Sequence, residues 1–360
     1  MIVSLFTFVN KNIHSIKIIK EKLMAVYNRI FTEEKWDKVN KYNKNLLNDY
    51  MMQIKSEGKS KGTMNQYFND ARIILIYILE DLDNKPLYKL NRKSFRNMVL
   101  WMQENGLSPA RVNRMLSVSR NLLNFGMDDD DYAEEFDDCK ANPSRIKGMQ
   151  KEKVRDIVFL SEKEMSIIYN ELMNKGKYAQ ALLCALMYDS ASRRNEVYQL
   201  KRDDISLEES VCKSVVIGKR GKKYRPLYNQ RTKDAYVKYM ETRTDQHDTL
   251  WVTREGTPAS YESLYAWVVS WRKLLEKHTG EYKEFNAHSW RHSALENYSN
   301  GTHYVSVELG RKMGMDVSNG VGKCFTLEEL QILANHSDIS TTQSYLMDKS
   351  EDMLLQAFGI

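Results

Sequence analysis

The sequence predicts a mainly α-helical protein with one small β-hairpin, divided into two domains. Its 360 residues exceed one average domain, and the 42% hydrophobic content is enough for ordinary cores. Between Thr32 and Phe125 apolar residues recur at steps of three and four, which predicts helices. A β-branched run with a glycine-containing turn, residues 214–227, predicts the hairpin.

Charge and cysteine content exclude some classes of protein without selecting one. The net charge is +6 and the isoelectric point is about 8.8, a mild basic bias that permits a nucleic-acid partner. Four cysteines, at positions 139, 184, 212 and 324, show no Cys-x-x-Cys spacing, so we expect reduced thiols. No metal site is predicted, because His288, His292 and His303 lack the His-Glu-x-x-His spacing and an accompanying carboxylate cluster.

Composition shifts along the chain predict the domain boundaries. We interpret residues 1–23 as an extension, because their apolar run is far shorter than the ~20 residues of a membrane span and no basic region precedes it as in a signal peptide. Residues 24–138 form the first predicted domain and residues 157–360 the second. Between them, residues 139–156 follow an acidic segment and turn basic, which indicates a linker or a basic strap.

Local signals place the helices of the first domain. Thr32 followed by two glutamates is typical of a helix start, and Ser108-Pro109 is another. A helix is also predicted after Asn91. The clearest stripe of apolar residues is Met64, Tyr67, Phe68, Ala71, Ile74, Leu75, Ile78 and Leu82.

The second domain begins with a capping box, Ser161 to Glu164. An apolar helix through Tyr178–Tyr188 is expected to be buried and to deliver Arg193, three positions before Glu196. A further helix is expected to start near His288 and run to about Ser299, with Arg291 on the same face as His288. Residues 300–325, rich in glycine, are interpreted as a lengthened loop.

The segment from His336 to Tyr345 places an imidazole and a phenol nine positions apart. A phenol is a poor nucleophile at neutral pH, because its free pKa is about 10. Attack on a phosphate requires a nearby base and a strongly cationic pocket. Arg193, Lys219, His288 and Arg291 are candidates to supply them.

In order, residue type and approximate spacing, these positions resemble the signature of the tyrosine recombinase (phage integrase) family. The resemblance covers about residues 159–345 and includes Arg-x-x-Glu, a hairpin lysine, His-x-x-Arg and a Ser-Thr-Thr-x-x-Tyr tail. It implies an α-helical core-binding domain at 24–138 and a tyrosine recombinase catalytic domain at 157–360. Two departures are the 45 positions between Arg291 and His336, longer than in compact members, and Asn335 where glycine is commoner. Asn335 tolerates the left-handed backbone conformation better than most residues.

The resemblance implies a site-specific recombinase whose nucleophile is Tyr345, forming a 3′-phosphotyrosyl bond. Arg193 and Arg291 would hold the non-bridging oxygens, and His288 and His336 would hydrogen-bond the phosphate, one of them as base. Lys219 would protonate the leaving 5′ oxygen, with Lys222 as the runner-up because the loop length differs from the commonest pattern. No ATP, metal or other cofactor is implied.

The implied partner is double-stranded DNA with inverted-repeat core sites, bound by a homotetramer that is a monomer or dimer when free. We expect integration or excision of a phage or mobile element. The protein is expected to act in the cytoplasm of a bacterial host, at the nucleoid and without membrane contact. An accessory DNA-bending or directionality protein could take part. The last residues, 350–360, are expected to dock on a neighbouring protomer, or otherwise on their own domain. DNA contacts are assigned to Arg111, Arg114, Arg145, Lys147 and Lys222, although on an arbitrary helix residues such as the first two more often belong to a solvated face.

Two other functions share these motifs. A type IB topoisomerase-like nicking enzyme would use the same residue types, although the hairpin and the His-x-x-Arg context favour an integrase. A recombinase-fold regulator, such as a phage repressor, would bind DNA without turnover. The complete set of six catalytic-type positions favours an enzyme over the regulator.

Overall fold

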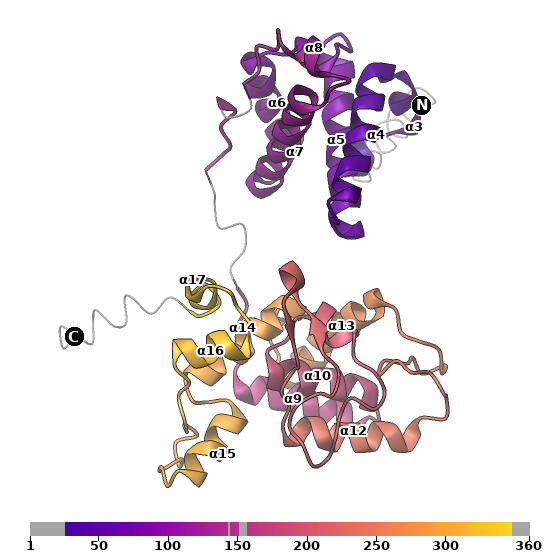
Figure 1. The fold of residues 1–360 in the computed structure, drawn as a ribbon. Helices are drawn as coiled ribbons and strands as arrows, with labels where there is room; N and C mark the ends of the chain where they lie inside the picture. Colours follow the sequence, from indigo (N-terminus) through magenta and orange to yellow (C-terminus); the bar gives the residue numbers. More distant parts are fainter. Residues whose placement is uncertain (1–25, 143–144, 151–156, 348–360) are drawn as a thin grey trace, which may run out of the picture. The chain divides into compact units, whose positions relative to one another are not determined.

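The computed structural model describes residues 26–142, 145–150 and 157–347 (Figure 1). The chain divides into two compact units, unit 1 (Met1–Arg155) and unit 2 (Asp156–Ile360). Predictions for residues 1–23, for part of the basic linker and for the tail 350–360 lie outside the described residues. Within the described residues, no helix has the length and apolar character needed to cross a membrane.

All the regular secondary structure in the described part of unit 1 is helical, as expected. Side-chain caps define where several of these helices begin. Thr32, Asn91 and Ser108 each accept a hydrogen bond from a backbone N–H of the first turn, which confirms three predicted starts. The predicted apolar stripe lies on α5, whose buried residues run from Asp70 to Ile78. The elements are α2 (Val26–Ile30), α3 (Glu33–Lys38), α4 (Lys41–Ser56), α5 (Lys61–Asp81), η1 (Leu87–Lys89), α6 (Arg92–Glu104), α7 (Pro109–Asp128) and α8 (Ala133–Phe136).

A buried carboxylate joins α5 to α7. Asp70 is 1% exposed and accepts hydrogen bonds from Nε and Nη2 of Arg114, at 2.6 and 3.2 Å. Arg111 lies further from the same carboxylate, with its Nε 3.9 Å from Oδ1. The two arginines are therefore more than a solvated face, because each has an anionic partner inside unit 1. Their predicted contact with DNA phosphates remains a prediction.

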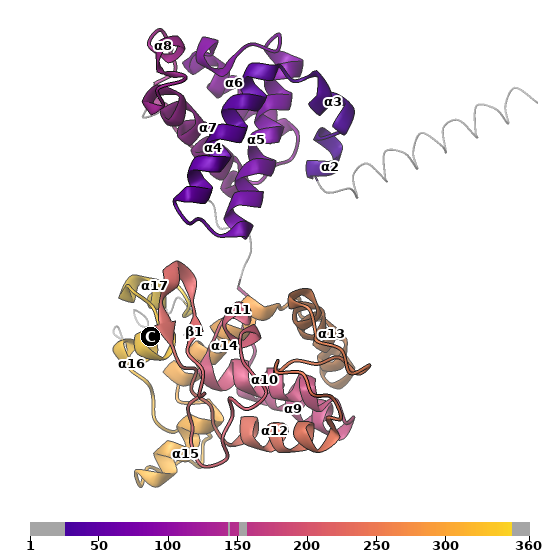
Figure 2. The same cartoon turned by 45° about the vertical axis from the view of Figure 1, so that its right-hand side comes forward.

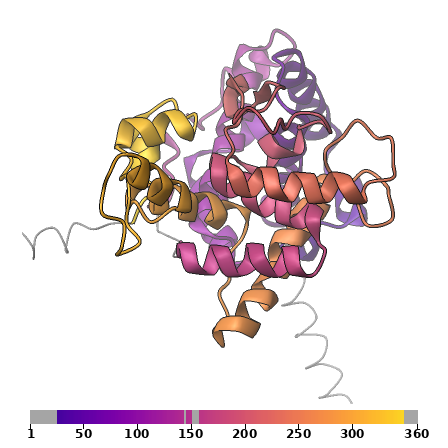
Figure 3. The same cartoon turned by 90° about the horizontal axis from the view of Figure 1, so that it is seen from below.

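Unit 2 is built around α10, which is buried from Ala181 to Ser190 as its apolar sequence predicted. This helix packs against α9, α12, α13 and α14. Helices α9 and α12, magenta and salmon in the view from below, cover one face of the unit (Figure 3). The elements are α9 (Glu162–Asn174), α10 (Tyr178–Ser190), α11 (Arg194–Tyr198), β1 (Val216–Ile217), η3 (Lys219–Gly221), β2 (Lys223–Tyr224), α12 (Gln230–Thr242), α13 (Tyr261–Thr279), α14 (Ala287–Ser299), α15 (Tyr304–Lys312), α16 (Leu327–Leu333) and α17 (Ile339–Gln343).

The predicted hairpin is present but shorter than expected. Strands β1 and β2 pair antiparallel, with Val216 opposite Tyr224 and Ile217 opposite Lys223. A single bridge between Val211 and Leu227 continues the pairing at the base of the hairpin. The short 3₁₀ helix η3 connects the two strands in place of a tight turn, so Lys219 lies on this helix and Lys222 follows it.

The interpretation of residues 300–325 as a loop is wrong for their first half, where α15 forms. The rest of the segment returns along α15, since Lys323 N donates to Ser306 O at 2.9 Å and Gly322 N donates to Gly301 O at 2.9 Å. The glycines permit this close approach, because a Cβ at Gly322 would collide with the carbonyl of Ser306 and lie 2.6 Å from Val307 Cα. Gly301, Gly310 and Gly322 thus serve backbone packing, whereas Gly314 and Gly320 adopt positive φ in open space.

We predict that Gly322→Ala destabilises unit 2 by about 1–3 kcal/mol, the usual cost of overpacking a filled site. The neighbour of the added methyl group is backbone, which cannot rotate away. Lys312→Ala, at an exposed position at the end of α15, is the matched control and should change stability by less than about 0.5 kcal/mol. Urea unfolding followed by circular dichroism gives both values, and equal stabilities would contradict the packed return segment.

Candidate active site

Three separate parts of unit 2 bring the predicted residues together. Arg193 follows the buried helix α10 at the start of α11, after Ala191 turns the chain with φ +48°. His288 and Arg291 lie on α14. His336 and Tyr345 flank α17, after Asn335 turns the chain with φ +49°, a left-handed conformation that its residue type tolerates. In two views α16 and α17 lie together on one side of the unit (Figures 1 and 2).

The start of α14 determines where its two site residues point. The Asn286 side chain accepts from the backbone N–H groups of His288 and Ser289, and Ser289 completes a capping box. The cap places His288 in the first turn and Arg291 three positions later on the same face. His288 is therefore at the exposed end of the helix, whereas Arg291 is 1% exposed.

Glu196 links the two arginines. Its carboxylate is 1% exposed and accepts from Arg193 Nη1 at 3.0 Å and from the Tyr224 hydroxyl at 2.7 Å. Arg291 Nη1 lies 3.8 Å from the same carboxylate. Burial lowers the pKa of the Arg193 guanidinium, but the Glu196 carboxylate outweighs burial and the pKa lies above its usual value. Two guanidiniums with one carboxylate leave a net positive charge in the pocket.

Arg291 is held by backbone carbonyls and by a histidine. Nη1 donates to Ala191 O at 2.5 Å, and Nη2 donates to Ala334 O at 2.7 Å. The Nη2 group also lies 2.7 Å from His336 Nε2. Its Nε is buried and has no hydrogen-bond partner among the described residues. Since a buried donor without a partner is costly, this N–H is suited to an oxygen of a ligand.

His336 is a neutral imidazole of defined tautomer. Arginine can only donate, so Nε2 of His336 accepts from Arg291 and the proton is on Nδ1. That Nδ1 donates to the Thr342 hydroxyl at 2.9 Å. Burial and the nearby Arg291 and Arg193 lower the pKa of His336 to about 3. His288 is also neutral near pH 7, because partial burial, His292 and Arg291 lower its pKa to about 4.

Tyr345 lies among these groups. It is 7% exposed, and its ring centroid lies 4.9 Å from that of His336 and 5.2 Å from that of His288. The guanidinium carbon of Arg291 lies 5.2 Å from the ring centre. By contrast, another phenol of unit 2, Tyr298 on α14, is fully buried and donates to Asp189 O at 2.9 Å. Tyr345 is therefore the phenol that this cluster surrounds.

The hairpin lysines differ in their relation to this cluster. Lys219 is exposed on η3, and no contact joins it to the other predicted site residues among the described residues. Lys222 is half-buried and close enough to help lower the pKa of His336. Of the six predicted catalytic positions, the structure thus brings five together, and Lys219 stays at the tip of the hairpin. The runner-up Lys222 is nearer to the cluster.

The residues assigned to DNA contact fall in three groups. Arg145 and Lys147 are exposed near the end of unit 1, as a contact with a phosphate backbone requires. Arg111 and Arg114 share the carboxylate of Asp70. Lys222 belongs to the hairpin of unit 2. None of these positions is a metal ligand candidate, and the described residues contain no group of three or more His, Cys, Asp or Glu side chains that could hold a metal ion.

Sequence reasoning missed two functional candidates on α14, His292 and Glu296. Both are 4% exposed, and both bond to the backbone next to the nucleophile candidate. His292 had been weighed as a metal ligand and not in this role. The signal that could have found them is their spacing, since polar residues four apart on a buried helix lie on one face and need partners there.

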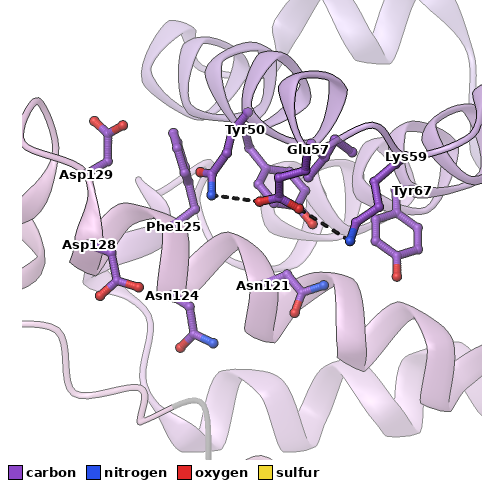
Figure 4. Close-up of a pocket in the computed structure, with 11 residues that line it drawn as sticks. Tyr50, Glu57, Lys59, Tyr67, Asn121, Asn124, Phe125, Asp128 and Asp129 are labelled. Atoms are coloured by element: carbon purple, nitrogen blue, oxygen red, sulfur yellow. Dashed lines mark hydrogen bonds and ion pairs between the residues drawn. The ribbon is translucent and has the colours of Figure 1, made fainter.

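A separate hollow of about 410 Å³ lies among α4, α5 and α7 of unit 1 (Figure 4). Aromatic, amide and acidic side chains line it. Glu57 points into it, accepts from Gln53 at 3.1 Å and pairs with Lys59 at 3.3 Å. Its carboxylates, on Glu57, Asp128 and Asp129, make it unsuited to a phosphate, so we do not assign DNA backbone binding to this hollow.

The chain is similar in sequence to known recombinases. The sequence profile of the phage integrase family matches residues 158–307. The tyrosine recombinase XerC of Treponema denticola is 23% identical over 316 residues, which cover 82% of this chain and 90% of XerC. The prophage-derived recombinase-like protein YomM of Bacillus subtilis is 23% identical over 238 residues, which cover 62% of this chain and 69% of YomM.

Solved structures share the fold. A lambda integrase dimer bound to a COC′ core site matches with a TM-score of 0.60 at 15% identity, covering 84% of this chain and 94% of that chain. The Tn1549 transposon integrase in complex with circular intermediate DNA matches with a TM-score of 0.54 at 18% identity, covering 86% and 98%. Fold and matched sequence are those of a tyrosine site-specific recombinase. Residues 158–307 thus match the phage integrase family, and the chain is similar to tyrosine recombinases over most of its length.

We predict that the stability of unit 2 falls as the pH decreases below about 6.5, and that His336 contributes. Its native pKa of about 3 is below the ordinary histidine value, so in this range the unfolded chain binds a proton that the native state does not. His336→Asn, which keeps a donor for Thr342 but does not titrate, should reduce the slope by up to about 1.4 kcal/mol per pH unit. Urea unfolding between pH 7 and pH 5 measures it, and identical slopes would contradict the neutral assignment.

Proposed function

We propose that this chain cuts and rejoins DNA at specific sites through a 3′-phosphotyrosyl intermediate. The observation that carries the proposal is Tyr345, a phenol enclosed by two guanidiniums and two neutral imidazoles. A phenol near phosphate-binding cations is the arrangement that nucleophilic attack on a phosphodiester needs.

The first step exchanges one bond to phosphorus for another. The Tyr345 oxygen bonds to phosphorus as its proton passes to an imidazole, and the bond from phosphorus to the 5′ oxygen breaks. We assign the proton acceptor role to His288, because the lone pair of His336 Nε2 already accepts from Arg291. A hairpin lysine gives a proton to the departing 5′ oxygen, in the role assigned to Lys219. The phosphodiester energy is kept in the tyrosyl ester, so rejoining needs no ATP.

The arginines stabilise the charge that develops on the non-bridging oxygens. Arg193 is partly exposed and can meet a phosphate directly, whereas Arg291 is buried under neighbouring groups. The Nε of Arg291, which has no hydrogen-bond partner among the described residues, can donate a hydrogen bond to a phosphate oxygen. The Tyr345 ring lies 5.2 Å from this guanidinium, so the phenol and the proposed phosphate donors are already neighbours. Donors that are already oriented before the reaction cost little reorganisation in the transition state.

Double-stranded DNA with inverted-repeat core sites is the proposed substrate. The lambda integrase neighbour was solved as a dimer bound to a core site, which supports a multimer on DNA, and the Tn1549 integrase was solved in complex with circular intermediate DNA. Exchange of two strand pairs requires four protomers, so we propose a tetramer on DNA that is a monomer or dimer when free. Similarity to a prophage-derived protein and to a transposon integrase supports integration or excision of a phage or mobile element in a bacterial cytoplasm.

The competing function is a DNA-binding regulator of the same fold without turnover. Both proteins would bind a specific duplex, but only the recombinase would form a covalent bond to it. The target site can be obtained by selecting duplexes from a random library with the Tyr345→Phe variant. A nicked suicide duplex of the selected sequence then traps any covalent intermediate.

We predict that the unaltered chain forms an adduct with this suicide duplex, stable to denaturing electrophoresis, in buffer that contains EDTA. Tyr345→Phe lacks the attacking oxygen and should form none, while its affinity for the duplex and its urea unfolding stay close to those of the unaltered chain. An adduct with Tyr345→Phe would mean that another residue attacks. Absence of an adduct from the unaltered chain on its own selected site would favour the regulator.

A second prediction separates the two hairpin lysines. If Lys219 is the acid, Lys219→Ala should slow cleavage by about 10²–10⁴-fold, the range for general acid catalysis. A duplex with sulfur in place of the 5′ bridging oxygen should restore the rate, because a thiolate leaves without a proton. Lys222→Ala, the matched variant, should slow cleavage of both duplexes equally. Rescue of Lys222→Ala alone would transfer the role to Lys222, which lies nearer to His336.

A further inference from the structure

Helix α14 holds the main chain on both sides of the nucleophile candidate. His292 Nδ1 lies 2.9 Å from the carbonyl oxygen of Tyr345, and Met347 N donates to Glu296 Oε2 at 2.9 Å. A carbonyl oxygen only accepts, so His292 carries its proton on Nδ1. His292 and Glu296 are four positions apart on one face of the helix, and each is 4% exposed. Two hydrogen bonds to α14 thus hold the main chain of residues 345–347.

The side chain of Tyr345 is also placed by His292. The two rings are stacked, with centroids 4.1 Å apart and planes inclined by 21°. This is the shortest of the ring contacts that Tyr345 makes with the three histidines around it. One residue therefore contacts both the carbonyl and the ring of Tyr345, which restricts the position of the main chain and the tilt of the phenol together.

Among the described residues, the other anchors of this segment are the packing of α17 on α16 and of Leu346 on the core of unit 2. Helix α17 has five residues, of which Thr342 is buried, and that threonine bonds to His336. Ile339 and Met347, on either side, are 38% and 45% exposed. A helix this short has little stability of its own, so its position depends on such contacts. The contacts with α14 hold the end of the segment that contains Tyr345.

The same helix carries His288 and Arg291, which are the groups proposed to bind the phosphate. An anchor on α14 therefore sets the distance between the phenol oxygen and the phosphate within one rigid body. Misplacement of a reacting group by about 1 Å can cost about 10²-fold in rate. The position of the tyrosine main chain is thus as important as the presence of its hydroxyl.

We propose that His292 is a positioning residue, which with Glu296 aligns Tyr345 for attack through the tyrosine carbonyl and ring. The inference rests on the proposed function and adds to it a role for a histidine that does not contact the phosphate. His292 acts through Tyr345, so its removal should slow only the reaction in which Tyr345 is the nucleophile.

Two substitutions separate the contacts of His292. His292→Phe keeps a ring to stack on Tyr345 but loses the donor to its carbonyl. His292→Asn loses the ring but has an amide N–H near the place of Nδ1. We expect His292→Phe to form the covalent adduct about 10²-fold more slowly than the unaltered chain, and His292→Asn to recover a large part of that loss. Equal rates for His292→Phe and the unaltered chain would overturn the role of the carbonyl bond.

A second measurement removes the tyrosine from the reaction. In a Tyr345→Ala background, hydrogen peroxide can attack phosphorus in place of the phenol, and the 5′ oxygen leaves as before. Strand cleavage then depends on the other groups of the site. We expect His292→Phe in this background to cleave within about twofold of the background itself. A loss as large as that of the tyrosine-dependent reaction would mean that His292 acts on the phosphate or supports the whole site, and would overturn the proposal.

Glu296 supplies an independent pair of variants if His292→Phe fails to fold by circular dichroism and urea unfolding. Glu296→Gln keeps an acceptor for Met347 N, and Glu296→Ala removes it. The alanine variant should lose adduct formation but keep peroxide cleavage, and the glutamine variant should keep both. An unaltered chain that forms no adduct would refute the proposed function, whereas adduct formation insensitive to both positions would refute only the positioning role.

Discussion

The carboxylate of Glu196 is the interaction on which the rest of the site depends. Two guanidiniums, Arg193 and Arg291, enter one largely buried pocket, where their mutual repulsion is poorly screened. Glu196 lies between them, 3.0 Å from one and 3.8 Å from the other, and it also accepts from Tyr224 of β2. It therefore neutralises part of the charge while joining α11, α14 and the hairpin. A cationic pocket can exist before DNA arrives because this anion is already in place.

Burial, together with the positive charge that remains, determines the protonation state of the histidines. A protonated imidazole next to Arg291 would add a further cation to a buried site, so the pKa values of His288 and His336 are low and both rings are neutral. Neutral rings have lone pairs, and that of His336 is used to hold Arg291. Next to the arginine pair, His288 is thus a neutral ring that can accept a proton, and His336 is a neutral ring that supports Arg291. The proposed division of labour between the two histidines follows from that geometry.

The nucleophile candidate is attached to this charged centre by short-range contacts. Its ring stacks on His292, its carbonyl accepts a hydrogen bond from the same residue, and Glu296 accepts from the backbone N–H of Met347. These groups lie on α14, which also carries Arg291, so one helix relates the phenol to the cations. Helix α10, buried beneath, supplies the rigid support from which the chain turns at Ala191 into Arg193. The groups proposed to bind and attack the phosphate are therefore supported by the buried helix of unit 2.

The sequence by itself determined the helix starts at Thr32, Asn91 and Ser161, the buried helix α10, the hairpin and the left-handed Asn335. These depend on interactions between residues a few positions apart, which a local pattern records. It also named five residues that the structure brings together, through a pattern of residue types shared with a family. Tertiary structure alone decided that Arg114 pairs with Asp70, 44 positions away, and that His292 reaches the Tyr345 carbonyl, 53 positions away. It likewise placed Lys222 nearer the cluster than Lys219 and folded α15 from a glycine-rich segment. Such contacts depend on how helices pack, and no local pattern records which distant side chain will fill a given space.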